Sequence, residues 1–162
     1  MINNILQDRE KRYCEILSLI IKYSMPVVCG KINYPGDNKN TIEAQSAFRI
    51  LQQLLRERFT ENSKHIQVLS GHDGSSILIA TNFKSLEAKK IAVSLEANHS
   101  LGRIFDIDVY ETDGSPISRE SLGIESRRCI ICSDDARICM RTGCHSLQEV
   151  VDRVNQLIHY NI

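Results

Sequence analysis

Two aspartates stand one residue apart near the middle of the chain. Asp106 and Asp108 alternate with apolar residues between 105 and 109, which is typical of a β-strand with one apolar and one acidic face. Because alternate side chains on a strand point the same way, the two carboxylates would lie side by side. Such a pair can bind Mg²⁺, which prefers oxygen ligands and bridges phosphate oxygens. The alternative is an edge strand with a solvated acidic face.

A second group of candidate ligands is a short run of cysteines. Two residues separate Cys129 from Cys132, and Cys139 and His145 follow. Thiolates at this spacing reach one ion, and three thiolates with one imidazole match the ligand set of tetrahedral Zn²⁺. Cys144, beside His145, leaves the fourth ligand open. Two other interpretations also stay open: buried cysteines that act as small hydrophobes, or a redox couple at the first pair.

The cations of the C-terminal half are all of one kind. From residue 91 to the end, every basic side chain other than histidine is an arginine. A guanidinium binds phosphate oxygens through two parallel hydrogen bonds, which an ammonium cannot do. Together with the acid pair these cations favour a polyphosphate ligand, although a surface ion pair is the alternative role for any single one. They are Arg103, Arg119, Arg127, Arg128, Arg137, Arg141 and Arg153.

Composition excludes some classes of function. The chain has 162 residues, 42% of them hydrophobic, which is enough for one globular core. Because 20 basic and 20 acidic residues cancel, we expect neither nucleic acid nor an anionic membrane to be bound by bulk electrostatics. No apolar run approaches the roughly 18 residues of a membrane span, and the N-terminus lacks the layout of a signal peptide. We therefore expect a cytoplasmic protein whose six cysteines are thiols or metal ligands.

The elements that must position these residues follow from periodicity. Apolar residues at helical spacing predict helices at 3–23, 42–58, 84–97 and 146–159, with Thr41 and Ser146 as N-caps. Apolar runs predict strands at 27–32, 65–69, 76–80 and 105–109, with 117–119 as a hairpin partner of the last. The expected fold is α+β in one domain, 1–162. Its sheet would be mixed or mostly antiparallel with about five strands, with helices on one face and a Cys-rich segment at 127–145.

The loop at 70–75, between the two middle strands, contains Gly71 and Gly74. Glycine lets backbone amides approach a phosphate closely, so this loop is a candidate phosphate cradle. A plain hairpin turn is the favoured interpretation, because no flanking helix or lysine completes a phosphate-binding motif.

Several of these residues form ordered motifs. They are Glu96-x-x-His99-x-Leu101-Gly-Arg-x-x-Asp106-Ile-Asp108-Val, then Ile117-Ser-Arg119, then Arg128-Cys129-x-x-Cys132 through Cys139-x-Arg141 to His145. This arrangement resembles the citrate lyase holo-acyl-carrier-protein synthases, also called apo-citrate lyase phosphoribosyl-dephospho-CoA transferases. Weaker matches at Asp8-Arg9-Glu10 and Asn33-x-Pro35-Gly36-x-x-Lys39 fall in the expected order, so the likeness covers most of the chain.

The resemblance implies a transferase with a loosely nucleotidyltransferase-like fold. It would move a 2'-(5-phosphoribosyl)-3'-dephospho-CoA group from triphosphoribosyl-dephospho-CoA to a serine of the citrate lyase acyl carrier protein, the γ subunit, and release diphosphate. On this hypothesis Asp106 and Asp108 hold Mg²⁺, and Glu96 or His99 is a further metal ligand or general base. The substrate-binding cations would be Arg103, Arg119, Arg128 and Arg141.

Two other classes of function fit the same residues. One is a zinc-stabilised protein-binding module without catalysis, and the other is a Mg²⁺-dependent phosphohydrolase that needs no carrier protein. A binding module would carry stoichiometric zinc and ignore Mg²⁺ and triphosphate. The transferase would gain thermal stability from these two together, as any protein does from ligands that select its native state.

Overall fold

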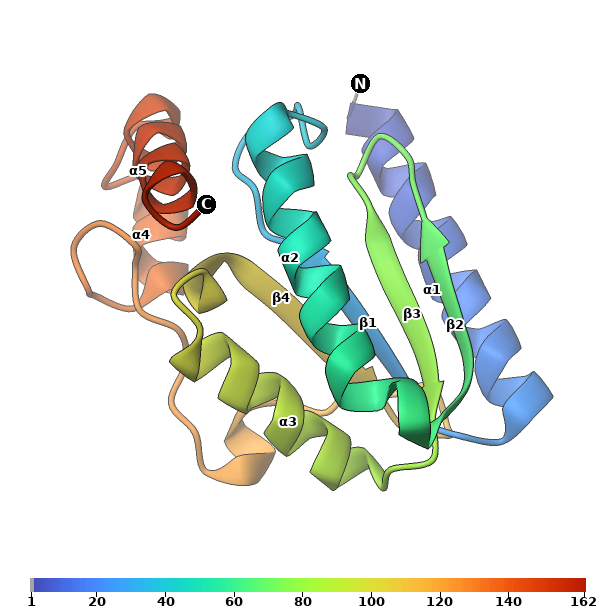
Figure 1. Cartoon of the computed structure of the whole chain (residues 1–162). Coiled ribbons are helices and arrows are strands. Elements are labelled where there is room, and N and C mark those ends of the chain that lie inside the picture. The colour runs from blue at the N-terminus through green and yellow to red at the C-terminus, as the bar shows by residue number, and fades with distance from the viewer. Residues whose placement is uncertain (1) are drawn as a thin grey trace.

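The computed structural model describes residues 2–162 as helices on both sides of an antiparallel sheet (Figure 1). The α-helices are α1 (Ile2–Tyr23), α2 (Ile42–Phe59), α3 (Ser85–Asn98), α4 (Ala136–Thr142) and α5 (Leu147–Tyr160). The strands are β1 (Val27–Ile32), β2 (Ser63–Leu69), β3 (Ser76–Thr81) and β4 (Phe105–Tyr110). The predicted α+β class is confirmed. Among these residues, no helix has both the length and the apolar character needed to cross a membrane.

The helices predicted from periodicity are confirmed, and their ends differ from the predicted ones by at most one residue. Thr41 and Ser146 are N-caps as predicted, because their side-chain oxygens accept the N–H groups of Ala44 and Glu149. The Glu149 carboxylate in turn accepts the Ser146 N–H and completes a capping box. Only α4 was not predicted, since a helix of 7 residues is too short to show an apolar stripe.

The sheet has four strands in the order β2-β3-β1-β4, and every neighbouring pair is antiparallel. The prediction of about five strands is wrong, because 117–119 does not form a strand. After the turn at Gly114, the chain makes one isolated bridge between Tyr110 and Pro116 and one hydrogen bond from the Ile117 N–H to the Val109 C=O. It then leaves the sheet, so β4 is an edge strand.

Helices cover both faces of the sheet, which corrects the prediction that they lie on one. In Figure 1, α2 and α3 lie in front of the sheet and α1 lies behind it. All residues of β3 are buried: Ile77 and Ile79 belong to the core with α2, and Leu78 and Ala80 pack with α1. A continuous apolar run indicates a strand that is covered on both faces. The run at 76–80 therefore already indicated that helices cover both faces of the sheet.

The pairing of β1 with β4 positions the acid pair. Lys31 lies opposite Asp106, and Cys29 lies opposite Asp108. Opposite residues in antiparallel strands point to the same face. Since Cys29 packs with residues of α1, both aspartates lie on the α1 face of the sheet. The apolar residues of β4 are buried on the other face, so the predicted alternation is confirmed.

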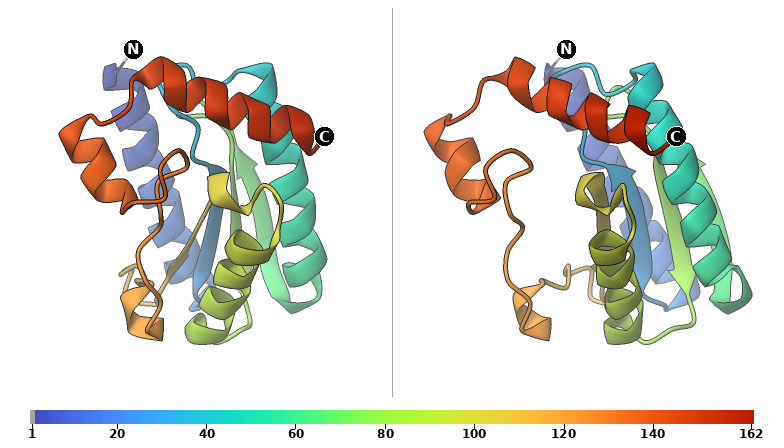
Figure 2. Two further views of the ribbon diagram at one scale, coloured as in Figure 1. Left: turned by 90° about the vertical axis from the view of Figure 1, so that its left-hand side faces the viewer. Right: turned by 60° about the vertical axis from the view of Figure 1, so that its left-hand side comes forward.

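The chain after β4 surrounds the free edge of this strand. It leaves the sheet in irregular turns, forms α4 and returns as α5, which runs past the end of α2 (Figure 2). Val154 and Ile158 of α5 are buried in the core shared with α2. The Tyr34 hydroxyl donates to Asn155 Oδ1 at 2.8 Å and ties the segment 33–39 to the same helix.

The loop at 70–75 is a hairpin turn in which the N–H groups of residues 72–74 already have partners within the protein. Asp8 of α1 accepts the N–H groups of His72 and Asp73 through its Oδ2. Arg9 and Arg12, also on α1, pair with the buried Asp73 carboxylate. The Asp8 carboxylate thus accepts two of the amides that a phosphate would need, which favours a plain hairpin turn over a phosphate cradle.

Candidate active site

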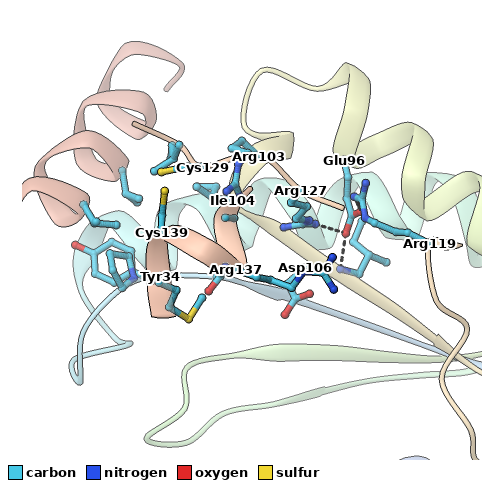
Figure 3. Close-up of a pocket in the computed structure, with 18 of the residues that line it drawn as sticks. Tyr34, Glu96, Arg103, Ile104, Asp106, Arg119, Arg127, Cys129, Arg137 and Cys139 are labelled. Atoms are coloured by element: carbon cyan, nitrogen blue, oxygen red, sulfur yellow. Dashed lines mark hydrogen bonds and ion pairs between the residues drawn. The ribbon is translucent and has the colours of Figure 1, made fainter. Parts of the chain in front are cut away.

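A cavity of about 760 Å³ opens beside the free edge of β4 (Figure 3). Its walls come from β4, helix α3, the segment 33–39, the turns after β4, and helices α4 and α5. This volume lies within the roughly 300–1,000 Å³ typical of small-molecule sites. Acidic, basic and apolar side chains all line it.

Both aspartates of the acid pair line this cavity. Lys31 Nζ lies 2.5 Å from Asp106 Oδ2. The Asp108 carboxylate, in contrast, makes no hydrogen bond or ion pair with any residue from 2 to 162, although the charges of Lys31 and Lys89 act on it. The pair therefore presents one carboxylate that has a partner and one that has none.

The two carboxyl groups differ in acidity. Burial alone would raise the pKa of Asp106, but the Lys31 ammonium outweighs this effect and holds that pKa below its usual value. Burial raises the pKa of Asp108, and the nearby charge of Asp106 raises it further. A divalent cation between the two would favour the ionised form of each. The donor set, two carboxylates on one rigid strand, fits such a cation.

Side chains rather than a fifth strand satisfy the outer edge of β4. The Ile107 N–H donates to Glu96 Oε1 at 2.9 Å, and the Ile107 C=O accepts from Lys89 Nζ at 3.3 Å. Arg127 donates to the Phe105 C=O. Buried backbone groups need such partners. Here the partners are charged residues that also line the cavity.

Glu96 holds two guanidinium groups at this edge. Its side chain is 4% exposed and pairs with Arg119 and Arg127, as Figure 3 shows. Oε1 also accepts the Ile107 N–H. Both carboxylate oxygens are therefore occupied, and the structure does not bring Glu96 into the acid pair.

Only part of the predicted arginine set faces the cavity. Arg128 pairs with Glu125 on the surface, with its side chain 64% exposed, and Arg141 is exposed in the last turn of α4. Neither lines the cavity. Four arginines do line the cavity, of which two were predicted to bind substrate and two were not. The four are Arg103, Arg119, Arg127 and Arg137.

His99 lies outside the cavity, at the end of α3. Its Nδ1 accepts the Leu101 N–H at 3.0 Å, and its ring packs on Phe105 with the ring centroids 5.1 Å apart. Burial lowers the pKa of His99 below its usual value, which favours the neutral ring that accepts this hydrogen bond. His99 is thus the C-cap of α3, and its imidazole hydrogen-bonds the turn that follows the helix.

Two lysines that were not predicted also line the cavity, Lys39 and Lys89. A signal for Lys89 was present in the sequence. Lys89 and Glu96 are seven residues apart on one helix, which is close to two full turns, so the two side chains share a face. A buried stripe of a helix that contains both signs of charge indicates a polar site as well as a core.

The structure brings the four predicted zinc ligands together. One donor atom from each of Cys129, Cys132, Cys139 and His145 lies within 4.8 Å of all the others. Thiolates around one zinc ion lie about 3.8 Å apart, given a Zn–S distance of about 2.3 Å. His145 Nε2 is buried without a hydrogen-bond partner among the described residues, as expected of an atom placed to bind a metal. The cluster can therefore hold a metal ion.

The backbone around Cys129 favours its thiolate. Burial opposes ionisation, but the N–H groups of Cys132 and Ile131 outweigh it and lower the pKa of Cys129 to about 7. The thiolate is the form that binds metals. This cysteine and Cys139 also line the cavity, so the cluster forms part of its wall.

The identity of the fourth member is resolved by the distances between the ligand atoms. Cys144 is exposed, and its thiol hydrogen-bonds Thr142 rather than turning toward the other cysteines. His145 is the residue that joins them. Cys132 is exposed as well, so it does not act as a buried hydrophobe.

Comparison with known proteins extends over nearly the whole chain. The model of the CitX family, described as apo-citrate lyase phosphoribosyl-dephospho-CoA transferase, matches residues 1–161. The chain belongs to this family. The resemblance inferred from the motifs between 96 and 145 is thereby confirmed.

Relatives in the CitX family are similar along the full length of this chain. Protein CitXG of Leuconostoc mesenteroides subsp. cremoris is 31% identical over 159 residues, 96% of this chain but 34% of that protein. The probable apo-citrate lyase phosphoribosyl-dephospho-CoA transferase of Vibrio cholerae is 28% identical over 163 residues, covering 98% of this chain and 91% of that protein. The transferase of that name from Escherichia coli is 26% identical, and the match covers 88% of that protein. The chain thus spans about a third of the first relative and nearly all of the second.

Proposed function

We propose that this CitX chain moves the phosphoribosyl-dephospho-CoA group from triphosphoribosyl-dephospho-CoA to a serine of the citrate lyase acyl carrier protein and releases diphosphate. Membership of the family supports the substrate class. The observation that carries the chemistry is the unpartnered Asp108 beside Asp106, in a cavity that arginines also line. Attack of a hydroxyl on a phosphorus centre with diphosphate leaving depends mainly on positioning and charge neutralisation.

Asp106 and Asp108 are the proposed magnesium ligands. Bound there, Mg²⁺ would neutralise phosphate charge and polarise the phosphorus that is attacked. Lys31 keeps Asp106 ionised, and the rigid strand keeps the two carboxylates on one face. The assignment of the enzyme to a nucleotidyltransferase type of mechanism rests on this acid pair and on the triphosphate donor.

The cations at the β4 edge are the proposed phosphate ligands. Glu96 orients Arg119 and Arg127, so their guanidinium groups are held in place before substrate arrives. Arg103 lines the same cavity and is fixed by donation from its Nε to the Arg128 C=O at 2.8 Å. In this proposal Glu96 is a positioning residue rather than a metal ligand or base.

The far end of the cavity suits the uncharged part of the donor. Tyr34 lies there, away from Glu96 and Arg119 in Figure 3. Val150 and Val154 of α5 line the cavity too. Apolar walls of this kind bury the body of a ligand, whereas a few charged groups fix its orientation.

The four-residue cluster is proposed to bind structural Zn²⁺. All four protein ligand positions of a tetrahedral ion are filled, which is typical of structural rather than catalytic zinc. Between them, the ligands span from Cys129 to His145, where the chain has one short helix and turns. The ion would fix this segment as a wall of the cavity.

The test is a transfer assay read by mass. The protein is incubated with apo acyl carrier protein, the triphosphate donor and Mg²⁺, and the carrier gains the mass of the prosthetic group on its serine. A carrier whose acceptor serine is replaced by alanine should gain nothing. Diphosphate release without carrier would instead indicate a phosphohydrolase. No response to donor and Mg²⁺, together with stoichiometric zinc, would indicate a binding module.

A further inference from the structure

Lys89 is a buried cation without an anionic partner. It lies on α3 and is 4% exposed. Its one hydrogen bond within residues 2–162 goes from Nζ to the Ile107 C=O at 3.3 Å. An ammonium group carries three N–H donors, so two of them lack a partner.

This arrangement differs from that of Lys31. Lys31 Nζ contacts the Asp106 carboxylate at 2.5 Å, so its charge is compensated within the protein. The carboxylate that shares the cavity-facing side of α3 with Lys89, that of Glu96, already pairs with Arg119 and Arg127. A buried charge is costly unless an opposite charge and hydrogen bonds compensate it.

The cavity also contains an acidic group that has no ion-pair partner. Asp108 lines it with a carboxylate that makes no ion pair, and Lys89 lines it with a cation that acts on Asp106 and Asp108 through its charge but makes no ion pair with either. The two do not form an ion pair with each other. A ligand that is anionic at one point and carries a divalent cation at another would satisfy both. Metal-bound polyphosphate has this composition.

We propose that Lys89 is a phosphate-binding residue of the CitX chain, which receives an oxygen of the donor's triphosphate from the α3 side of the cavity. The inference rests on the proposed function, since it places the same triphosphate. It adds a cation that no motif pointed to. The helix and the Ile107 carbonyl hold the ammonium in place before the ligand arrives.

A charge-removing variant separates this role from a structural one. Lys89→Met keeps the length of the side chain and removes a buried charge that has no ion pair. This gain offsets the lost hydrogen bond to the Ile107 C=O, so the ligand-free protein should unfold close to the wild-type temperature. Its affinity for inorganic tripolyphosphate with Mg²⁺ should fall about 10- to 100-fold, the value of a hydrogen bond to a charged group. Lys90→Met is the matched control, because Lys90 is adjacent and exposed. It should leave affinity unchanged.

The outcomes are distinguishable by titration calorimetry and thermal unfolding. If Lys89 only anchors the edge of β4, Lys89→Met will unfold at a lower temperature and bind tripolyphosphate as the wild type does, which overturns the inference. If the wild type itself ignores tripolyphosphate and Mg²⁺, the proposed function fails along with it. Should Lys89→Met not fold, Lys89→Gln keeps an N–H donor without the charge. Wild-type affinity in that variant would overturn the inference equally.

Discussion

Glu96→Gln tests whether Glu96 positions the cations of the cavity or takes part in the chemistry. The carboxylate is 4% exposed, pairs with Arg119 and Arg127, and accepts the Ile107 N–H. Glutamine keeps the shape of the side chain and an acceptor for this N–H but removes the charge. We therefore expect both a loss of stability and weaker binding of the donor, because the two guanidinium groups lose the group that orients them.

The size of the stability loss follows from the burial of the partners. Removing one member of a buried ion pair costs about 3–5 kcal/mol. Here the two arginine side chains are 22% and 21% exposed, so water compensates part of their charge. Because the glutamine amide also retains some hydrogen bonding, we expect about 2–3 kcal/mol. For a chain of this length, that lowers Tm by about 5–10 °C.

Thermal unfolding without ligand measures this shift. The control is Glu120→Gln, because Glu120 is 63% exposed and lies 3.9 Å from Arg137. A surface pair of this kind contributes about 0–1 kcal/mol, so the control should unfold close to the wild type. Equal Tm values for the two variants would refute the anchoring role. A Glu96→Gln protein with wild-type Tm and donor affinity but no turnover would instead make Glu96 a base or metal ligand.

Three further results are expected. Asp108→Asn should abolish transfer, read by the mass of the carrier, without lowering Tm, because it neutralises a buried carboxyl group that has no partner. Chelation of metal, or His145→Ala, should expose more thiols to a thiol reagent, whereas Cys29 stays inert because burial raises its pKa to about 12. An unchanged thiol count after chelation would contradict the metal site. Arg127→Ala should weaken donor binding about 10-fold or more, whereas Arg128→Ala, outside the cavity, should leave titration calorimetry unchanged.

The parts of the structure that could be predicted are those with local signals. The apolar periodicity of a helix can be recognised within a few turns, and the caps at Thr41 and Ser146 depend on residues three positions away. The alternation of Asp106 and Asp108 with apolar residues is equally local. The spacing of Cys129 and Cys132 limits two ligands to one ion whatever the rest of the chain does.

The parts that could not be predicted depend on contacts between distant residues. No residue within 117–119 indicates that the chain will leave the sheet after a single bridge to β4. In an irregular segment, the type of a residue does not indicate the direction in which its side chain points. Arg127, for example, faces the cavity, whereas its neighbour Arg128 faces solvent. The ion pairs of Glu96 could not be predicted for the same reason, since its partners come from a segment more than twenty residues away.

The absence of a fifth strand leaves the outer edge of β4 free, and this free edge shapes the candidate site. An exposed strand edge invites pairing with another chain, and proteins protect such edges with charged side chains. Here Lys89, Glu96 and Arg127 satisfy outer backbone groups of Ile107 and Phe105 in β4 and also line the cavity. A fifth strand along this edge would take those backbone groups and displace the three side chains. The cations would then lie away from Asp106 and Asp108, so protection of the edge and assembly of the candidate site are one structural solution.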